Sequence, residues 1–195
     1  MVRKSVAVAR TAPHEVRIIG GQWKRTRLPV ADRPGLRPTP DRVRETLFNW
    51  LGQDLTGWRC VDAFAGTGAL GLEAASRGAA EVLLVEADAS LAEQLRALVT
   101  RLGAANVRVQ RGNALSVLPG LAAASADAVF LDPPFDAQLF DRAVEAALPA
   151  LAPDGVIYLE APAPWDEAAA ARHGLALLRH TRAGAVHGHL LRRAA

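Results

Sequence analysis

Cysteine is almost absent from this chain of 195 residues, which contains only Cys60. A single cysteine excludes an internal disulfide, and the five histidines show no spacing with it that is typical of a zinc site. The chain also lacks a long apolar run near its start. The apolar stretch that begins at Val6 is interrupted by Arg10, so it is too short for a signal peptide or a membrane span. We therefore expect a cytoplasmic protein with no membrane segment and no metal.

Internal repeats, low-complexity tracts and long linkers are missing as well, and half of the residues are hydrophobic, which favours a globular fold with a full core. The net charge of +3 hides an asymmetry. Residues 1–50 carry eleven Lys and Arg against four Asp and Glu, whereas residues 51–195 carry twelve against sixteen. A basic front on a slightly acidic body favours a polyanion-binding surface. We expect a flexible basic tail (1–13), an N-terminal β-hairpin with a helix (14–52) and a main domain (53–195).

The hairpin is predicted as two short strands, residues 15–19 and 22–28, on either side of a Gly20-Gly21 turn. Its basic residues surround Trp23, a pattern that suits phosphate contact and base stacking. The alternative is that Trp23 packs the hairpin onto the main domain. The candidate RNA-binding residues of this segment are Arg17, Lys24, Arg25 and Arg27.

A helix is predicted after Leu36-Arg37-Pro38, with Thr39 as its N-cap and Pro40 at the first helical position. Its apolar residues fall on one face and Gly52 ends it, so we expect Arg42 and Arg44 to point away from that face. Arg37, Thr39 and Arg42 are further candidate substrate-binding residues.

Beyond residue 58 the pattern alternates between strands and helices, which is typical of an α/β fold with a parallel sheet. The predicted strands are residues 59–64, 81–86, 107–110, 127–131, 155–160, 175–179 and 186–192, of which the last two form an antiparallel pair. The predicted helices are residues 69–77, 90–102, 138–151 and a shorter one near 115–118.

The first of these strands runs into a glycine-rich loop before a helix, where backbone can approach a ligand closely. Gly66, Gly68 and Gly71 spell G-x-G-x-x-G, and Glu86 follows twenty residues after Gly66. These features alone fit a dinucleotide site, so an NAD-dependent oxidoreductase is one alternative.

Two details favour S-adenosyl-L-methionine instead. Asp62 lies at the strand end, where it can hold a methionine amino group, and Asn113-Ala114 follow the third strand, where an amide can read adenine. A turn or helix cap is the alternative for Asn113. The candidate cofactor-binding residues are Asp62, Phe64, Gly66, Thr67, Gly68, Glu86, Asn113 and Ala114.

A second motif, Asp132-Pro133-Pro134-Phe135, closes the strand predicted at residues 127–131. Each proline fixes its own φ and removes an N–H, so the turn presents acceptors with few competing donors. An acid and a carbonyl beside an aromatic ring suit a flat base that carries an amino group. Asp132, Pro133 and Phe135 are therefore the candidate catalytic residues, and a capped turn with Phe135 in the core is the alternative.

Other chemistries are less well supported. Cys60 falls inside a predicted strand, where a buried core residue is expected, and no cysteine stands beside the Pro-Pro turn. His187 and His189 share one side of a strand that we expect at the sheet edge, without other clear metal ligands.

The chain resembles the RsmD-type methyltransferases from about Val16 to its C-terminus. The most specific segments are Arg17-Ile-Ile-Gly-Gly21, Arg37-Pro-Thr39 with Asp41-Arg-Val-Arg-Glu-Thr-Leu-Phe-Asn49, the glycine-rich loop and Asp132-Pro-Pro-Phe135. The resemblance implies a Rossmann-like class I methyltransferase fold, with a seven-stranded mostly parallel sheet, an antiparallel C-terminal strand and the N-terminal hairpin.

The resemblance also implies function. Such a protein uses S-adenosyl-L-methionine to methylate the exocyclic N2 of a guanine in 16S rRNA, within the small ribosomal subunit or its assembly intermediate, and acts as a monomer. Asn113 differs from the pattern of most methyltransferases, which commonly have an acidic residue at this position. The remaining alternatives are an amino-methyltransferase acting on DNA adenine N6 or protein glutamine, an NAD-dependent oxidoreductase, and a binding module without catalysis.

Overall fold

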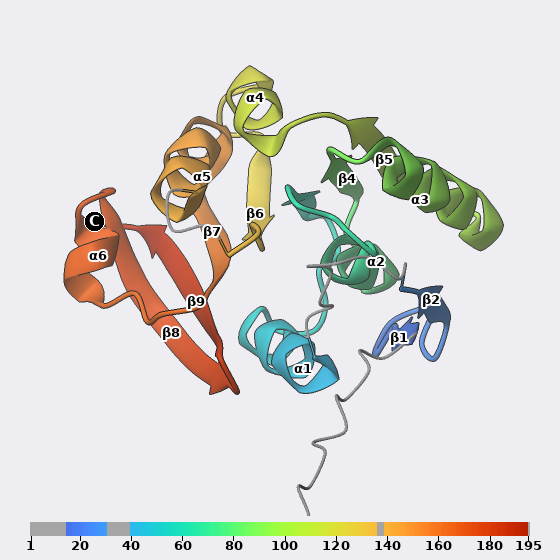
Figure 1. The fold of residues 1–195 in the computed structure, drawn as a ribbon, viewed down its shortest axis with the longest axis horizontal. Helices are drawn as coiled ribbons and strands as arrows, with labels where there is room; N and C mark the ends of the chain where they lie inside the picture. Colours follow the sequence, from blue (N-terminus) through green and yellow to red (C-terminus); the bar gives the residue numbers. More distant parts are fainter. Residues whose placement is uncertain (1–14, 31–39, 136–138, 195) are drawn as a thin grey trace, which may run out of the picture.

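The computed structural model describes residues 15–30, 40–135 and 139–194. Its centre is a seven-stranded sheet in the order β5-β4-β3-β6-β7-β9-β8, and a separate hairpin pairs β1 with β2 (Figure 1). The strands are β1 (Glu15–Arg17), β2 (Arg27–Pro29), β3 (Arg59–Asp62), β4 (Glu81–Glu86), β5 (Val107–Arg111), β6 (Ala126–Leu131), β7 (Leu151–Ala161), β8 (Leu175–Ala183) and β9 (Val186–Arg193). Because β3 to β7 pair in parallel and β9 is antiparallel to β7 and β8, the predicted fold class is confirmed.

Helices cover both faces of the sheet. In Figure 1, α1, α2 and α3 lie on one side of the line of strands, and α4, α5 and α6 lie on the other. Two short 3-10 turns, Leu118–Gly120 and Leu148–Ala150, follow α4 and α5. The helices are α1 (Asp41–Trp50), α2 (Ala69–Ser76), α3 (Ala89–Leu102), α4 (Ala114–Val117), α5 (Leu139–Ala147) and α6 (Glu167–Ala171).

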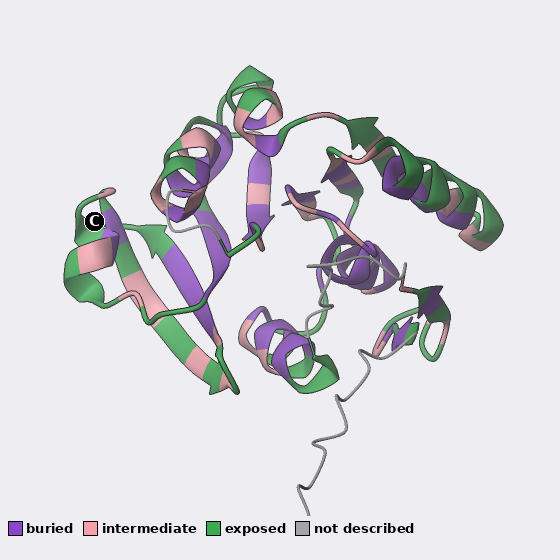
Figure 2. Ribbon diagram, viewed as in Figure 1, coloured by how far each residue is buried: buried purple, intermediate pink, exposed green. Residues whose placement is uncertain are grey.

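Alternating side chains of the strands fill two cores, one on each face of the sheet. Phe130 and Tyr158 belong to the core under α1, α2 and α3, whereas Leu131 and Leu159 belong to the core under α4, α5 and α6. The central strands and the inward helix faces are buried (Figure 2). Cys60 also lies inside, and burial raises the pKa of its thiol to about 12, which confirms the prediction of a core cysteine.

The hairpin is fastened to α2 by the loop between β1 and β2. The backbone N–H groups of Ile19 and Gly20 donate to the two carboxylate oxygens of Glu73, at 2.7 and 2.8 Å. Trp23 N–H donates to the hydroxyl of Ser76, at 2.9 Å, and that hydroxyl donates to the Gly20 carbonyl. The predicted strands of the hairpin were too long, because the helix rather than a cross-strand partner receives these N–H groups.

The end of α2 also explains the Gly-Gly pair. Gly21 has a φ of +72°, and a Cβ built there would lie 1.7 Å from the Ser76 carbonyl oxygen. Only glycine therefore allows the hairpin loop to approach α2 this closely. The Gly20-Gly21 pair therefore forms the turn of the hairpin and also allows the hairpin to pack against α2.

Arg44 of α1 completes the attachment. Its side chain is fully buried and lies 3.4 Å from Glu73, while it donates to the Arg17 carbonyl and to Asp41 at 2.8 and 2.6 Å. Arg77 contacts Glu73 from the other side, at 2.8 Å. The prediction that Arg44 points away from the apolar face is wrong, because this arginine neutralises a buried carboxylate that the hairpin and α2 share.

Two smaller predictions also need correction. Helix α1 begins at Asp41, with Pro40 as its N-cap residue, whereas Thr39 lies outside the described residues. Strand β9 lies between β7 and β8, so His187 and His189 are buried on an inner strand and the predicted edge position is wrong. No helix within the described ranges is long and apolar enough to cross a membrane.

Candidate active site

Strands β3 and β6 lie side by side at the centre of the sheet, and the chain leaves them in opposite directions. From β3 it continues through α2 to β4 on one side, and from β6 it continues to β7 on the other. In open α/β sheets such a reversal leaves a crevice at the carboxyl ends of the two strands, where ligands bind. Both sequence motifs, the glycine-rich loop and the Asp-Pro-Pro-Phe turn, follow these two strand ends.

The glycine-rich loop is held by Glu86 at the end of β4. One carboxylate oxygen of Glu86 accepts the N–H of Gly66 and the other accepts the N–H of Asp88, both at 2.8 Å. Gly66 and Gly68 have positive φ values of 51° and 77°. A carboxylate oxygen has two acceptor positions, so each oxygen keeps one for a ligand hydroxyl. The residues present therefore fit a cofactor that carries a ribose.

Asp62 is fully buried beneath this loop and accepts the N–H of Gly71 at 2.9 Å. Burial raises the pKa of Asp62 to about 7; the Gly71 hydrogen bond opposes the shift, and the negative charges of Glu86 and Glu160 add to it. A cationic group at the strand end would relieve this cost. The methionine part of S-adenosyl-L-methionine, with its amino group and sulfonium, has that charge.

The other predicted cofactor-binding residues are placed around the same strand ends. Phe64 is half-buried and Thr67 is buried in the glycine-rich loop. Asn113 is exposed, and its side-chain oxygen accepts the N–H of Leu115, so it caps α4, as the alternative interpretation predicted. Ala114 is buried at the start of α4. A contact between Asn113 and adenine remains a prediction.

The Asp-Pro-Pro-Phe turn goes from a half-buried start to an exposed end. Asp132 is half-buried, Pro133 is buried and Pro134 is exposed. Phe135 is 49% exposed, and its ring is tilted against that of Phe140 at a centroid distance of 6.4 Å. This exposure contradicts the alternative of a core residue and leaves about half of the side chain accessible.

The strand register relates the acids at these strand ends to one another. Asp62 pairs with Leu84 on β4 and with Phe130 on β6. Glu86 and Asp132 follow these two partners by two residues, and side chains two residues apart in a strand share a face. Glu86 therefore lies on the face of Asp62, one step nearer the carboxyl edge of the sheet. Asp132 comes one residue after the end of β6, near enough to Tyr158 for its charge to raise the pKa of that side chain.

Strand β7 adds two polar residues that the sequence analysis missed. Glu160 is 2% exposed, and the hydroxyl of the buried Tyr158 donates to its Oε1 at 3.0 Å. Burial raises the pKa of Tyr158 well above its usual value, and the charges of Glu160 and Asp132 raise it further. The signal was present: Tyr158 and Glu160 are two residues apart, in a stretch, residues 155–161, that is otherwise apolar.

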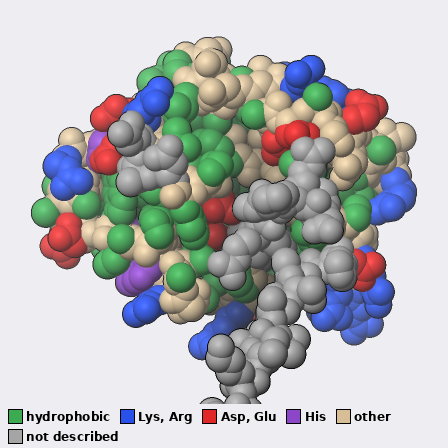
Figure 3. Space-filling model, viewed as in Figure 1, with side chains coloured by type: hydrophobic (Ala, Val, Ile, Leu, Met, Phe, Trp, Pro, Cys, Tyr) green, Lys and Arg blue, Asp and Glu red, His purple; other side chains and the backbone are tan. Residues whose placement is uncertain are grey.

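The predicted RNA-binding residues are gathered on the hairpin and α1. Figure 3 shows Lys and Arg side chains grouped at the lower right, over the β1–β2 segment. Trp23 is half-buried and packs against the core, which agrees with the packing alternative. Arg37 and Thr39 lie outside the described residues. The remaining predicted residues, Arg17, Lys24, Arg25, Arg27 and Arg42, are exposed, and of these Arg27 forms an ion pair with Glu15 at 3.0 Å.

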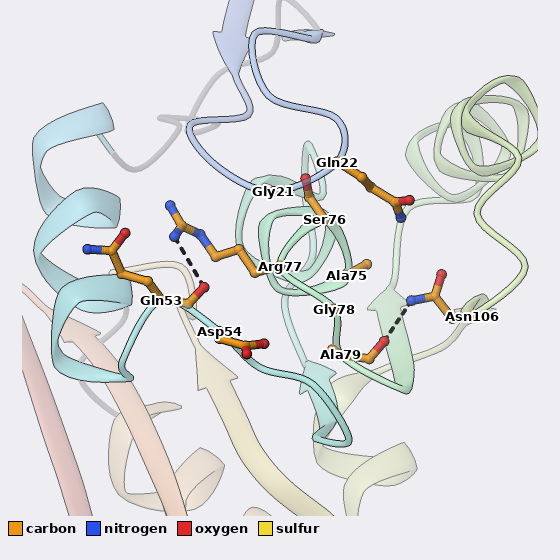
Figure 4. A pocket seen from close by; sticks show the side chains of 10 residues that line it. All are labelled: Gly21, Gln22, Gln53, Asp54, Ala75, Ser76, Arg77, Gly78, Ala79 and Asn106. Atoms are coloured by element: carbon orange, nitrogen blue, oxygen red, sulfur yellow. Dashed lines mark hydrogen bonds between the residues drawn. The ribbon is translucent and has the colours of Figure 1, made fainter.

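A cavity of about 490 Å³ lies elsewhere, at the C-terminal end of α2. Figure 4 shows it between Gly21-Gln22 of the hairpin loop, Gln53-Asp54 after α1, and Asn106 before β5. The glycine-rich loop begins α2 at its other end, so this cavity belongs to neither motif. The volume of a cavity alone therefore does not locate the candidate site in this fold.

Three histidines form a stacked cluster on β8 and β9. Both ring nitrogens of His189 contact backbone groups, Nδ1 the Leu159 carbonyl at 3.1 Å and Nε2 the Trp165 N–H at 2.9 Å. His180 and His187 contact each other through ring nitrogens 2.9 Å apart. Burial lowers the pKa of His189 to about 4, which keeps Nε2 free to accept. These bonds hold His189 as a structural residue of β9.

The chain matches the family model described as Conserved hypothetical protein 95 over residues 16–192. It belongs to this family. Two relatives named Ribosomal RNA small subunit methyltransferase D confirm the resemblance drawn from the motifs. The Escherichia coli relative is 47% identical over 148 residues, which cover 75% of this chain and 74% of that protein. The Haemophilus influenzae relative is 40% identical over 159 residues, which cover 76% of this chain and 80% of that protein.

Solved structures support the same relationship. The structure of yhhF from Escherichia coli has a TM-score of 0.79 and 40% identity, and the match covers 92% of this chain and 98% of that one. The structure of HI0767 from Haemophilus influenzae has a TM-score of 0.76 and 34% identity, and the match covers 93% and 99% of the two chains. The likeness to these two solved structures therefore extends over most of the chain.

Proposed function

We propose that this protein is an S-adenosyl-L-methionine-dependent methyltransferase that methylates the exocyclic N2 of a guanine in small-subunit ribosomal RNA. The observation that carries the proposal is the position of Asp132. It is half-exposed just after β6, next to the strand that leads into the glycine-rich loop, and it follows Phe130, the strand partner of Asp62, by two residues. The names of the relatives favour this activity over an oxidoreductase.

The chain offers a suitable group for each part of the cofactor. Glu86 is placed for the ribose hydroxyls, Asp62 for the amino group, and the loop around Gly66 and Gly68 for close backbone contact before the N-terminus of α2. When bound, S-adenosyl-L-methionine supplies an electrophilic methyl group on a positively charged sulfur. Alignment and exclusion of water are then the main tasks of the protein.

The acceptor side needs a base that is held still and made more nucleophilic, because the lone pair of a guanine N2 is delocalised into the ring. Asp132 and the Pro133 carbonyl accept the two N–H bonds of the amine, which draws the nitrogen towards tetrahedral geometry. The exposed part of Phe135 stacks on the base, which has been turned out of its own stack. The proton leaves after the methyl group arrives, so a strong base is not needed.

The hairpin is the proposed RNA-binding surface. Its exposed basic residues suit contact with phosphates, which position an RNA without reading its sequence. The hydrogen bonds to Glu73 and Ser76 hold this surface rigidly against α2, the helix that begins at the glycine-rich loop. RNA bound by the hairpin is thereby kept at a fixed position relative to the cofactor.

A labelled-methyl assay tests the proposal. The protein is incubated with labelled cofactor and with unmodified small subunits, naked 16S rRNA or DNA, and the product is digested to nucleosides. We expect label in N2-methylguanosine from the ribosomal substrates. Label in a methylated adenine or in protein would refute the substrate, and calorimetry that detects NAD binding but no S-adenosylhomocysteine binding would refute the enzyme class.

A further inference from the structure

The cavity at the C-terminal end of α2 is lined by side chains whose oxygens are left to accept hydrogen bonds. Nδ2 of Asn106 donates to the Ala79 carbonyl at 2.7 Å (Figure 4). On the opposite side, Nε2 of Gln53 donates to Oδ1 of Asn49 at 3.0 Å. These bonds orient the two amides, and neither amide oxygen accepts a hydrogen bond from any described residue. Each oxygen is therefore open to a ligand.

Asp54 and Gln22 add further acceptors. Oδ1 of Asp54 accepts the hydroxyl and the N–H of Thr56, at 2.7 and 2.9 Å, and these bonds lower the pKa of Asp54, so that it is ionised at neutral pH. Among the described residues, Oδ2 of Asp54 and the side-chain amide of Gln22 have no hydrogen-bond partner. Figure 4 shows Gln22 on the side of Asn106, and Asp54 on the side of Gln53.

The other polar groups at this helix end are already engaged. Nε of Arg77 contacts Glu73 at 2.8 Å. The Ser76 carbonyl accepts the N–H of Gln22 at 2.8 Å, and the Arg77 carbonyl accepts that of Leu55 at 2.9 Å. The free acceptor positions of the cavity therefore outnumber its free donors, which suits a ligand that carries amino or N–H groups.

The charge beside the cavity decides between two such ligands. Lys24 and Arg25 are exposed and follow Gln22 in the same hairpin loop. A lysine or arginine of a protein partner would meet these two like charges on its way to the acceptors. A nucleotide meets the acceptors with the amino group of its base and meets the two cations with its phosphate. The surroundings of the cavity therefore favour a nucleotide.

We propose that this cavity binds an unpaired base that carries an exocyclic amino group, in a nucleotide of the substrate RNA other than the one that is methylated. The proposal rests on the RNA substrate proposed above. Adenine, cytosine and guanine carry such an amino group, whereas uracil has a carbonyl oxygen instead. Helix α2 has eight residues and is about 12 Å long, so the cavity and the glycine-rich loop hold two separate parts of one RNA.

The test compares oligocytidylate with oligouridylate of equal length, because the two bases carry an amino group and a carbonyl oxygen at the same ring position. Affinities are measured by fluorescence anisotropy in an Asp132→Ala background, so that a preference does not come from the Asp132 carboxylate. We expect oligocytidylate to bind about tenfold more tightly, the effect of one hydrogen bond to a charged acceptor. Asp54→Asn and Gln53→Asn should each reduce this preference to less than about threefold.

The two variants are chosen to keep the local fold. In Asp54→Asn an oxygen still accepts from Thr56, while an amino group replaces the free acceptor. Asparagine also tolerates the φ of 64° at Gln53. Asp154→Asn is the matched control, since it removes one exposed negative charge on β7. It should leave the preference unchanged, because a loss of charge alone alters the affinity for both RNAs equally.

An unchanged preference in Asp54→Asn and Gln53→Asn would overturn the proposal, as would an equal loss of preference in Asp154→Asn. If Asp54→Asn weakens binding to small subunits but not the preference between the two RNAs, the cavity binds a protein group and the proposal fails. RNA binding is measured without methyl transfer. A cavity-dependent preference in a protein that forms no N2-methylguanosine would therefore support the cavity and overturn only the proposed function.

Discussion

Replacing Asp62 by asparagine is predicted to change how the stability of the free protein depends on pH. Asp62 has a pKa of about 7 in the folded chain, against 3.8 for an ordinary aspartate, and burial is the main cause. An asparagine has the same shape and its oxygen still accepts the N–H of Gly71, whereas the bond from the Phe64 N–H is lost at every pH. The substitution therefore removes a titrating carboxyl with little change in packing.

The sign follows from proton binding. Between the unfolded pKa of 3.8 and the folded value of about 7, the folded state binds more protons than the unfolded state, so the free energy of unfolding falls as the pH rises. The contribution of Asp62 is fully present below the unfolded pKa and is lost as the pH approaches 7. Each unit corresponds to about 1.4 kcal/mol, so the loss between pH 5 and pH 7 is about 2–3 kcal/mol.

Guanidinium unfolding at pH 5, 6, 7 and 8 measures this difference. All other groups titrate in both proteins, so their effects cancel when the free energy of unfolding of the wild type is subtracted from that of Asp62→Asn. This difference should grow from pH 5 to pH 7 and then level off. The same variant should bind S-adenosyl-L-methionine more weakly at pH 8, where an ionised Asp62 is available for the amino group. A stability difference that is equal at pH 5 and pH 8 would refute the raised pKa and its assigned cause.

Three further predictions concern the hairpin and the turn. Arg44→Met leaves the buried Glu73 with one cation fewer and should lower the free energy of unfolding by about 3–5 kcal/mol in chemical denaturation. Phe135→Ala should leave the melting temperature nearly unchanged, because the ring is 49% exposed, but should slow RNA methylation roughly tenfold through lost stacking. Lys24→Glu with Arg25→Asp should weaken RNA binding and reduce the slope of log affinity against log salt by about two.

Matched controls sharpen these tests. Arg42→Met, on the exposed side of α1, should change stability by less than about 0.5 kcal/mol. Aspartate is chosen at Arg25 because that residue has a φ of 72°, which aspartate tolerates better than most side chains. Arg179 and Arg182 lie on β8, the edge strand of the large sheet. Charge reversal at these two residues should affect RNA binding less than charge reversal on the hairpin. Equal effects would show that total charge, not the hairpin, governs binding.

Much of the fold could be predicted from local pattern. Strands β3, β4 and β6 are short apolar runs that end in an acid or a Pro-Pro turn, and their order along the chain implies parallel pairing. The two motifs meet because carboxyl ends of parallel strands share one edge. The sequence therefore indicates that Asp62, Glu86 and Asp132 lie near one edge of the sheet. For Asn113 the observed helix cap was only the alternative to the predicted adenine contact.

The remaining features depend on contacts between distant segments. Nothing near Arg44 in the sequence indicates that Glu73 needs a cation, and nothing near Gly20-Gly21 indicates that α2 receives the hairpin N–H groups. The burial of His189 required the position of β9 inside the sheet. The burial of Glu160 and its hydrogen bond with Tyr158 likewise became visible only in the folded sheet.

The central claim is that Asp132 and the glycine-rich loop form one site in which a bound cofactor meets an amino group of RNA. The most direct measurement is single-turnover transfer of labelled methyl to small-subunit rRNA by Asp132→Ala, with cofactor binding measured on the same preparation. We predict a loss of transfer of about 100-fold or more with cofactor affinity nearly unchanged. Transfer at the wild-type rate would contradict the account.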